Sequence, residues 1–318
     1  MPPRIITTAS AYSKSRLFLI TMEEATWRSD PFAQESRGYF FFQDIERPWS
    51  HNDVPASIVS VTRYRYPDRD RTIQVALTAE GDVSFIGREE NYWEKIEGAG
   101  LDSDDAKGWG LMNAIRQVGD TLFACGQGGQ VYERESRDRW KHIDAGLLRP
   151  LPGGKSVIFE DVNGPHEEAL YVVGQEGSAY YRGKKGKFEE LGLPTSAWLQ
   201  KILVKDEKTV YLCGSGGALV VGNAVDGFKE VTPGETNEGL LSMALFEDRL
   251  YVASERAVYV VDGDRLHRVR TSLTPDLVDA HVLDAVPGAL WSVGYQDVAR
   301  FDGQGWERFD LPENVPIR

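Results

Sequence analysis

Short apolar runs alternate with polar turns from about residue 57 to residue 312, and they recur in units of four. Within a unit the runs resemble 202–204, 210–213, 258–260 and 306–309, in that order. They are short, rich in β-branched and aromatic residues, and bounded by turn-forming residues, as β-strands are. The pattern therefore predicts repeated units of four strands.

A glycine-rich block ends the second run of each unit. It begins at Gly126, Gly174 and Gly214, returns in eroded form at Ser254 and Gly294, and has an earlier copy at 78–81. Neighbouring copies are 48 or 40 residues apart, and a repeat of this length made of short strands indicates a β-propeller with one blade per repeat. We expect the blocks to be tight hairpin turns, because glycine adopts positive φ without penalty. Since each block precedes a strand and not a helix, phosphate binding is not favoured.

The fourth run carries a second periodic mark. It starts with a bulky residue, continues with one or two polar residues and ends with a hydrophobe, as in 140–143 and 306–309. This alternation predicts a strand with one face in the core and the other in water. We expect its aromatic residues to pack between blades.

Residues 1–56 contain apolar runs but no glycine block. Four segments, Arg4–Thr7, Leu17–Ile20, Ala25–Trp27 and Tyr39–Phe42, are candidates for the strands of an atypical first blade. With six repeats in 57–312, this predicts an all-β chain whose residues 1–318 form a single β-propeller of seven four-stranded blades. A six-bladed ring with an appended hairpin is the alternative. Either ring requires the two ends of the chain to meet.

Composition narrows the class of partner. The 318 residues include 36 Lys and Arg against 49 Asp and Glu, a net charge of -13, which disfavours nucleic acid and attracts a basic partner. No apolar stretch has the length of a signal-peptide core or a membrane span, so we expect a cytoplasmic protein that does not bind membranes. Cys125 and Cys213 precede two of the blocks in equivalent positions, and we interpret them as small buried hydrophobes, not as a disulfide.

Candidate chemistry is sparse. The five histidines are not at metal-ligand spacing, and the acidic segment 102–105 lacks the glycine and distal glutamate of a helical calcium loop. No Gly-x-Ser-x-Gly motif is present. We therefore predict no catalytic residue, no metal and no cofactor. A hydrolase or lyase whose groups converge in a propeller channel is an alternative.

The segment Gly126–Tyr132, with the pattern Gly-x-Gly-Gly-x-Val-Tyr, and the Trp-led strand after it resemble divergent bacterial WD-repeat-like and BNR-like β-propellers. The resemblance covers about 57–312 and lacks the Gly-His and Trp-Asp pairs of eukaryotic WD repeats. It implies a rigid binding platform on which the second-to-third-strand hairpins and the blade-to-blade connections share one face. This face would carry nine acidic residues against two basic ones. Its candidate protein-binding residues are Asp102, Asp104, Asp105, Lys107, Trp109, Gln127, Gln175, Glu176, Trp198, Ser215, Glu235, Asn237, Glu238, Glu255, Arg256, Asp276, Asp279, Tyr295 and Gln296.

The leading hypothesis is a non-enzymatic binding protein, monomeric on its own, whose partner is a basic protein. Its concrete form is an immunity protein that neutralises a toxin, because complementary charge speeds such association. A scaffold or assembly platform that serves several partners is the alternative. Two lengthened loops, 64–71 and 98–110, are further places where a repeat scaffold carries binding residues.

Overall fold

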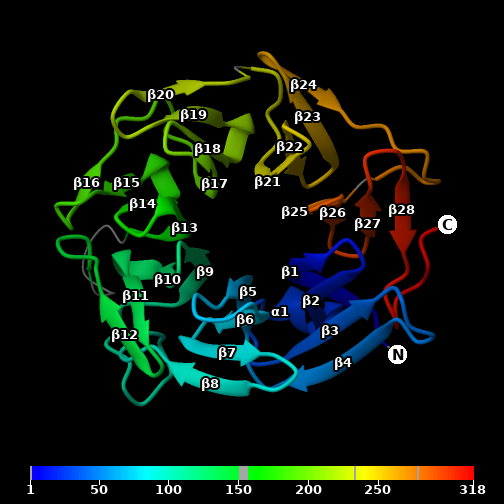
Figure 1. Cartoon of the computed structure of the whole chain (residues 1–318), viewed down its shortest axis with the longest axis horizontal. Helices are drawn as coiled ribbons and strands as arrows, with labels where there is room; N and C mark the ends of the chain where they lie inside the picture. Colours follow the sequence, from blue (N-terminus) through cyan, green and yellow to red (C-terminus); the bar gives the residue numbers. More distant parts are fainter. Residues whose placement is uncertain (1, 150–156, 233, 278) are drawn as a thin grey trace. The chain divides into compact units, whose positions relative to one another are not determined.

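Seven four-stranded antiparallel sheets, each with its strands in sequence order, are the blades of a β-propeller (Figure 1). The computed structural model describes residues 2–149, 157–232, 234–277 and 279–318. The seven-bladed prediction is confirmed, and the six-bladed alternative is wrong.

By their contacts the residues group into two compact units. Unit 1 comprises 1–57, 215–217 and 231–318, and unit 2 comprises 58–214 and 218–230. The single domain expected for 1–318 stays a prediction.

Unit 2 holds blades 2 to 5. Their strands are β5 (Ile58–Arg65), β6 (Thr72–Thr78), β7 (Asp82–Ile86) and β8 (Asn91–Lys95); β9 (Met112–Val118), β10 (Thr121–Gly126), β11 (Val131–Ser136) and β12 (Arg139–His142); β13 (Phe159–His166), β14 (Ala169–Gly174), β15 (Ala179–Arg182) and β16 (Phe188–Glu190); and β17 (Leu199–Asp206), β18 (Thr209–Gly214), β19 (Leu219–Asn223) and β20 (Gly227–Glu230).

Unit 1 holds blades 1, 6 and 7 and one short helix, α1 (Glu24–Ser29). The strands are β1 (Arg4–Ser13), β2 (Arg16–Glu23), β3 (Ser36–Phe42) and β4 (Trp49–Val54); β21 (Leu240–Phe246), β22 (Arg249–Ser254), β23 (Ala257–Asp262) and β24 (Arg265–Arg268); and β25 (Val282–Val286), β26 (Ala289–Val293), β27 (Val298–Phe301) and β28 (Trp306–Phe309).

Blade 1 differs from its prediction in its second half. The segment Ala25–Trp27, predicted as the third strand, lies in α1, where Glu24 and Arg28 form an i,i+4 ion pair with N···O 2.6 Å. Tyr39–Phe42, predicted as the fourth strand, belongs to the third strand, β3. The fourth strand is β4, which the sequence pattern did not predict because its sequence is polar and its central residues are exposed.

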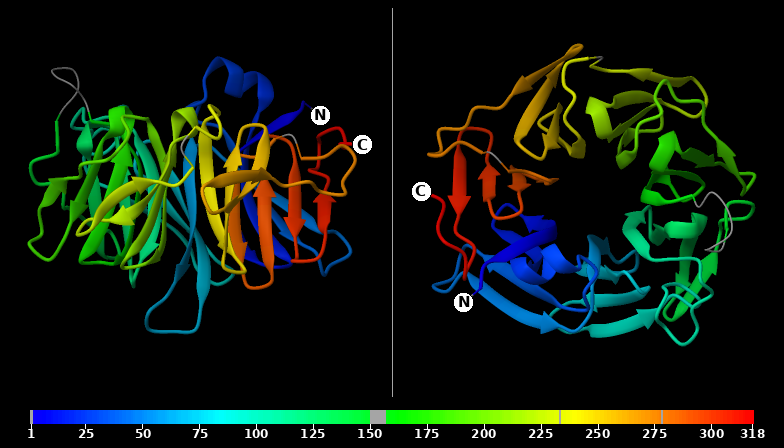
Figure 2. Two further views of the ribbon diagram at one scale, coloured as in Figure 1. Left: turned by 90° about the horizontal axis from the view of Figure 1, so that it is seen from above. Right: turned by 180° about the vertical axis from the view of Figure 1, so that it is seen from behind.

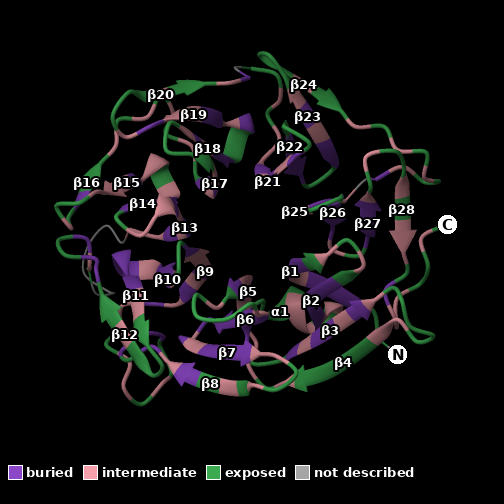
Figure 3. Cartoon of the chain, viewed as in Figure 1, coloured by how far each residue is buried: buried purple, intermediate pink, exposed green. Residues whose placement is uncertain are grey.

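Apolar side chains pack between neighbouring sheets of each unit. In blades 2 and 3, Leu77, Phe85, Ile115 and Leu122 share one fully buried cluster. The fourth strands are more exposed: in unit 2, most residues of β12, β16 and β20 are exposed to solvent (Figure 3). The half-exposed fourth strand is thus confirmed.

Side chains on the first strand of one blade bind backbone amides on the first strand of the next. In three cases the N–H belongs to a residue about 40 to 55 positions later in the sequence, and in the fourth a residue of the last blade binds the first blade. Each bond therefore joins two neighbouring sheets. The pairs are Ser60 Oγ with Ile115 N (3.2 Å), Asp161 Oδ2 with Ile202 N (3.1 Å), Ser242 Oγ with Leu283 N (3.0 Å) and Asp284 Oδ2 with Ala11 N (2.8 Å).

The two ends of the chain lie side by side within unit 1 (Figure 2). The Asn314 side chain accepts the N–H of Arg4 at 2.7 Å and donates to its carbonyl at 2.8 Å. The expected meeting of the ends is therefore observed.

Cys125 and Cys213 are buried and form no disulfide, as predicted. Within the part of the chain that the structure describes, no helix is long and apolar enough to cross a membrane.

Candidate protein-binding site

In a four-stranded antiparallel blade the second and fourth strands run in the same direction. The turn after the second strand and the connection after the fourth therefore lie at the same end of the sheet, which we call the hairpin edge of that blade. All nineteen candidate residues lie in such turns or connections. Their placement at hairpin edges follows from the strand order, and they divide between unit 2 (102–198) and unit 1 (215–296).

The glycine-rich blocks of blades 3 and 4 form single 3-10 turns, Gln127–Gly129 and Gln175–Gly177. The second and third residues of each turn have positive φ, including Glu176 at 53°. The residue before each turn needs glycine for another reason, close approach: a Cβ on Gly174 would lie 1.8 Å from the carbonyl oxygen of Ile158. The blocks are hairpin turns, as predicted.

In unit 2 the acidic loop, residues 102–105, is held in place by hydrogen bonds to carboxylates. The Asp105 carboxylate accepts the backbone N–H of Gly98 at 2.8 Å, and this bond lowers the pKa of Asp105. Glu80, which the sequence did not single out, accepts the N–H groups of Leu101 and Asp102, both at 2.9 Å. The side chains of Asp102 and Asp104 are exposed, so these two residues present the loop's charge to solvent.

Two of the candidate tryptophans lie in blade-to-blade connections of unit 2, Trp109 before β9 and Trp198 before β17. Trp109 is half-buried, with its ring edge-on to that of His142 at 4.6 Å. Trp198 is 42% exposed, and its indole N–H donates to Glu160 at 3.0 Å. Burial raises the pKa of Glu160. The sequence pattern did not indicate this residue, since it lies at the start of strand β13 and not in a turn or connection.

The remaining candidates of unit 2 are of mixed kind. The Gln127 side chain accepts the N–H of Leu111 at 3.3 Å and so supports its own turn. Gln175 is half-buried, whereas Lys107 and Glu176 are exposed.

In unit 1 the structure brings four predicted residues around one cavity of about 340 Å³. Its lining consists of Asn237, Glu238, Gly239, Glu255 and Arg256. Glu255 and Arg256 are the exposed two-residue turn between β22 and β23.

One lining residue of this cavity, Glu238, is held by two hydrogen bonds. Glu238 Oε2 accepts the Ser254 hydroxyl at 2.5 Å and the Tyr259 hydroxyl at 3.3 Å. Glu238 is therefore fixed in place, while Ser215 and Glu235 are exposed in their loops.

The connection into blade 7 contains two aspartates with structural bonds. Asp276 Oδ1 accepts the N–H groups of Thr271 at 3.0 Å and Leu277 at 2.9 Å; partial burial opposes ionisation, but bonds from Thr271 lower the pKa of Asp276. Asp279 Oδ2 accepts the N–H of exposed Gln296 at 3.0 Å, and burial raises the pKa of Asp279. Asp279 thus holds the β26–β27 turn.

Tyr295, in that same turn, contacts two other aromatic rings. It stacks on His281 with centroids 4.5 Å apart, and Trp27 of α1 lies 5.7 Å away on an inclined plane. Sequence reasoning missed Trp27 because it assigned 25–27 to a strand. The sequence feature that could have pointed to Trp27 is its position as a tryptophan in the connection between the second and third strands of blade 1.

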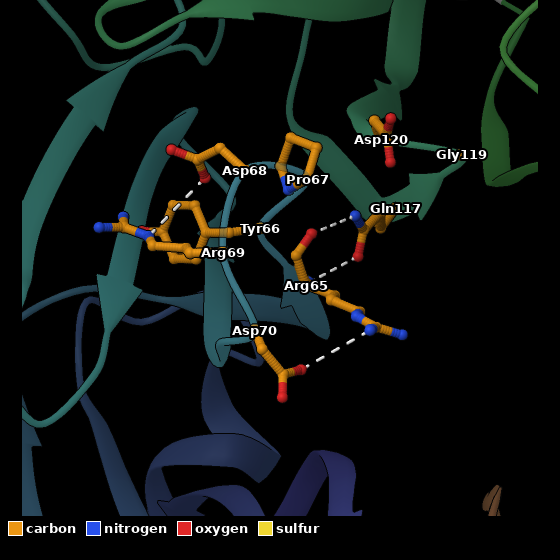
Figure 4. A pocket seen from close by; sticks show the side chains of 9 residues that line it. All are labelled: Arg65, Tyr66, Pro67, Asp68, Arg69, Asp70, Gln117, Gly119 and Asp120. Carbon is orange, nitrogen blue, oxygen red and sulfur yellow. Dashed lines mark hydrogen bonds and ion pairs between the residues drawn. The ribbon is translucent and has the colours of Figure 1, made fainter.

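A second hollow lies at the opposite edge of blades 2 and 3 (Figure 4). Its volume is about 610 Å³, and the lengthened β5–β6 hairpin, residues 65–70, forms most of its wall. Figure 2 shows this hairpin projecting beyond the other strands of unit 2. The Gln117 side chain grips both the N–H and the carbonyl of Arg65 at 2.8 Å, and Arg69 lies 3.8 Å over the Tyr66 ring.

The charges in this hollow are largely matched by their neighbours. Arg65 pairs with Asp70 at 3.6 Å and Arg69 with Glu90 at 3.0 Å. Because these pairs are exposed and screened by solvent, they add little to stability, and the hollow offers a partner little unbalanced charge. In the described ranges, no group of three or more His, Cys, Asp or Glu residues is placed to hold a metal ion.

Comparisons with known proteins complete the description. No family model matches the chain. It is 34% identical over 260 residues, 81% of either chain, to the "Immune protein Tsi7" of Pseudomonas aeruginosa. Among solved structures it resembles the WD40 β-propeller domain of Doa1, with TM-score 0.68 over 96% of this chain and 94% of that one at 9% identity. It also resembles YCF48 bound to D1 peptide, with TM-score 0.63 over 96% and 93% at 11% identity. The structural likenesses confirm the propeller resemblance inferred from the repeats.

Proposed function

Because this chain belongs to the family of the immune protein Tsi7, we propose that it is an immunity protein, which binds a protein toxin and blocks its action. The observation that carries the proposal is 34% identity over 81% of both chains, a length that takes in most of the blades. The immunity function predicted from the sequence is the class for which this relative is named.

Electrostatics supports a basic toxin as the partner. The chain carries a net charge of -13, and its hairpin-edge candidates include nine acidic residues against Lys107 and Arg256. Complementary charge steers encounter and raises the association rate of two proteins. The protein would act by covering the toxin, in the cytoplasm and as a monomer before binding, without catalysis or a cofactor of its own.

The test uses the product of the gene beside this one as the toxin. We expect cells that express that product to stop growing and to recover when this protein is co-expressed. The two purified proteins should elute together from size-exclusion chromatography. Unchanged growth arrest together with separate elution would refute the proposal.

A charge-reversed variant tests the edge itself. Asp102→Lys combined with Asp104→Lys changes the local charge by four units at two exposed positions. We expect the association rate at low salt to fall at least about tenfold, because steering by local charge is worth factors of 10 to 10³. The matched control, Glu168→Lys with Glu207→Lys, makes the same change in turns at the opposite edges of blades 4 and 5. Equal slowing by both pairs would contradict a role for this edge.

A further inference from the structure

Blade 1 turns from its second to its third strand in an unusual way. Blade 6 makes this turn with residues 255–256, whereas blade 1 uses 24–35 and places α1 there. None of the six described residues of α1 is buried, and no described side chain caps its N-terminus. A helix this short is unstable in isolation, and core packing does not account for it.

The aromatic side chain on α1 contacts a partner from blade 7. The ring of Trp27 lies 5.7 Å from that of Tyr295, which stacks on His281. The backbone around Tyr295 is held on two sides: its carbonyl accepts the N–H of Ile6 at 2.8 Å, and the next residue, Gln296, is bound by Asp279. Trp27 and Tyr295 both remain partly exposed. They form a fixed aromatic surface at the hairpin edge, which we call the aromatic anchor.

The surroundings of the aromatic anchor are negative. Asp279 Oδ2 accepts the N–H of Gln296, the residue after Tyr295, at 3.0 Å, and exposed Glu255 lies in the equivalent turn of the neighbouring blade 6. Burial, and then the charges of Glu255 and Asp279, raise the pKa of Tyr295. The nearby cation on α1, Arg28, is paired with Glu24 at 2.6 Å. Aromatic faces beside carboxylates attract cations, and the more so when water is excluded.

We propose that the toxin places a lysine or arginine side chain on the aromatic anchor formed by Trp27 and Tyr295, facing Glu255 and Asp279. The inference rests on the proposed immunity function and names the chemistry of its contact in unit 1. Partly exposed tryptophan and tyrosine are the residues that most often carry the energy of an interface. The acidic surroundings select a basic side chain over an acidic one.

The experiment measures the affinity of purified variants for the neighbouring gene's product by titration calorimetry. Trp27→Ala and Tyr295→Ala should each raise Kd at least about tenfold, as loss of an interface hot spot does. Trp27→Phe and Tyr295→Phe keep an aromatic face and should stay within about threefold of the parent. The matched control is Trp93→Ala on β8, a tryptophan that is 45% exposed away from the hairpin edge, and it should leave Kd unchanged.

A second readout guards against a variant that fails to fold. Toxin binding should shift the tryptophan emission of the parent, and this shift should shrink in Trp27→Phe although that variant still binds. If the parent binds and both alanine variants bind equally well, the aromatic anchor is wrong and the immunity function stands. Loss in Trp27→Phe as large as in Trp27→Ala would also overturn the cation contact. If the parent itself does not bind, the proposed function fails and the anchor with it.

Discussion

Gly174 offers a direct test of why the repeat keeps glycine where the second strand ends. Its φ of −173° is extended and open to any residue, so backbone strain does not require glycine. A Cβ added there would instead lie 1.8 Å from the carbonyl oxygen of Ile158 and 2.8 Å from its carbonyl carbon. Gly174→Ala therefore isolates the effect of close approach between two backbones.

The magnitude follows from the shift that the methyl group demands. Ordinary contact begins near 3.4 Å, so the carbonyl must move by about 1.6 Å (3.4 − 1.8). That carbonyl accepts the N–H of Gln175 at 3.1 Å, and losing this bond costs about 1 kcal/mol. Overpacking adds about 1–3 kcal/mol. We expect a total of about 2–4 kcal/mol, which for a chain of this size lowers Tm by roughly 4–8 °C.

Urea unfolding followed by circular dichroism, together with calorimetry, measures this loss. Gly192→Ala is the control, because no described atom lies within 4 Å of its added Cβ, and it should change stability by less than about 0.5 kcal/mol. The equivalent glycines extend the test: the Cβ distances are 2.1 Å at Gly214 and 2.4 Å at Gly126, so Gly174 should be the most costly. Equal stability of Gly174→Ala and Gly192→Ala would refute the reasoning.

Two further predictions concern carboxylates. Glu94→Ala should lower the free energy of unfolding, measured in urea, by about 3–5 kcal/mol. The substitution removes a buried carboxylate that binds Arg134 (N···O 2.6 and 2.9 Å) and Trp140 (3.1 Å). The control Glu89→Ala, at an exposed position, should lower the free energy of unfolding by less than about 0.5 kcal/mol. The pKa of Asp105 is lowered in the folded state, so its contribution to stability is present above the unfolded value near 4 and is lost as pH falls through the folded value. Asp105→Asn should therefore flatten the fall in stability below about pH 4, and an unchanged slope in acid unfolding would contradict this.

The number of blades could be predicted from the sequence because its signals are local. A glycine turn at Gly126 or Gly174 is set by a few neighbouring residues, and strand alternation is set by one face of one sheet. Blade 1 lacks both signals in its second half. There α1 lies next to β1 and β2 but buries none of its residues, so no apolar pattern marks it in the sequence. Strand β4 pairs with β3 through a polar sequence with little apolar alternation.

The candidate residues could be placed at hairpin edges, but their partners could not be foreseen. Strand order alone puts Glu238 and Glu255 at the same end of a blade. That Glu238 is held by Ser254 and Tyr259 depends on three-dimensional packing between segments about 16 to 21 residues apart. Trp27 meets Tyr295 only because the first and last blades of the chain lie together in unit 1.

The turn between the second and third strands has a structural role in blade 4, where glycines are kept, and a different character in blade 6, where they are replaced. In blade 4 the turn is tied to the connection leaving the blade, since the N–H of Gly177 donates to the carbonyl of Ala197 at 2.9 Å, and glycine is required there by geometry. In blade 6 the turn shortens to Glu255 and Arg256, both exposed, and Ser254 replaces the first glycine. Because the shorter turn does not need glycine, Glu255 and Arg256 carry side chains that are exposed to solvent. Binding specificity can then diverge at the turn while the strands on either side keep the fold.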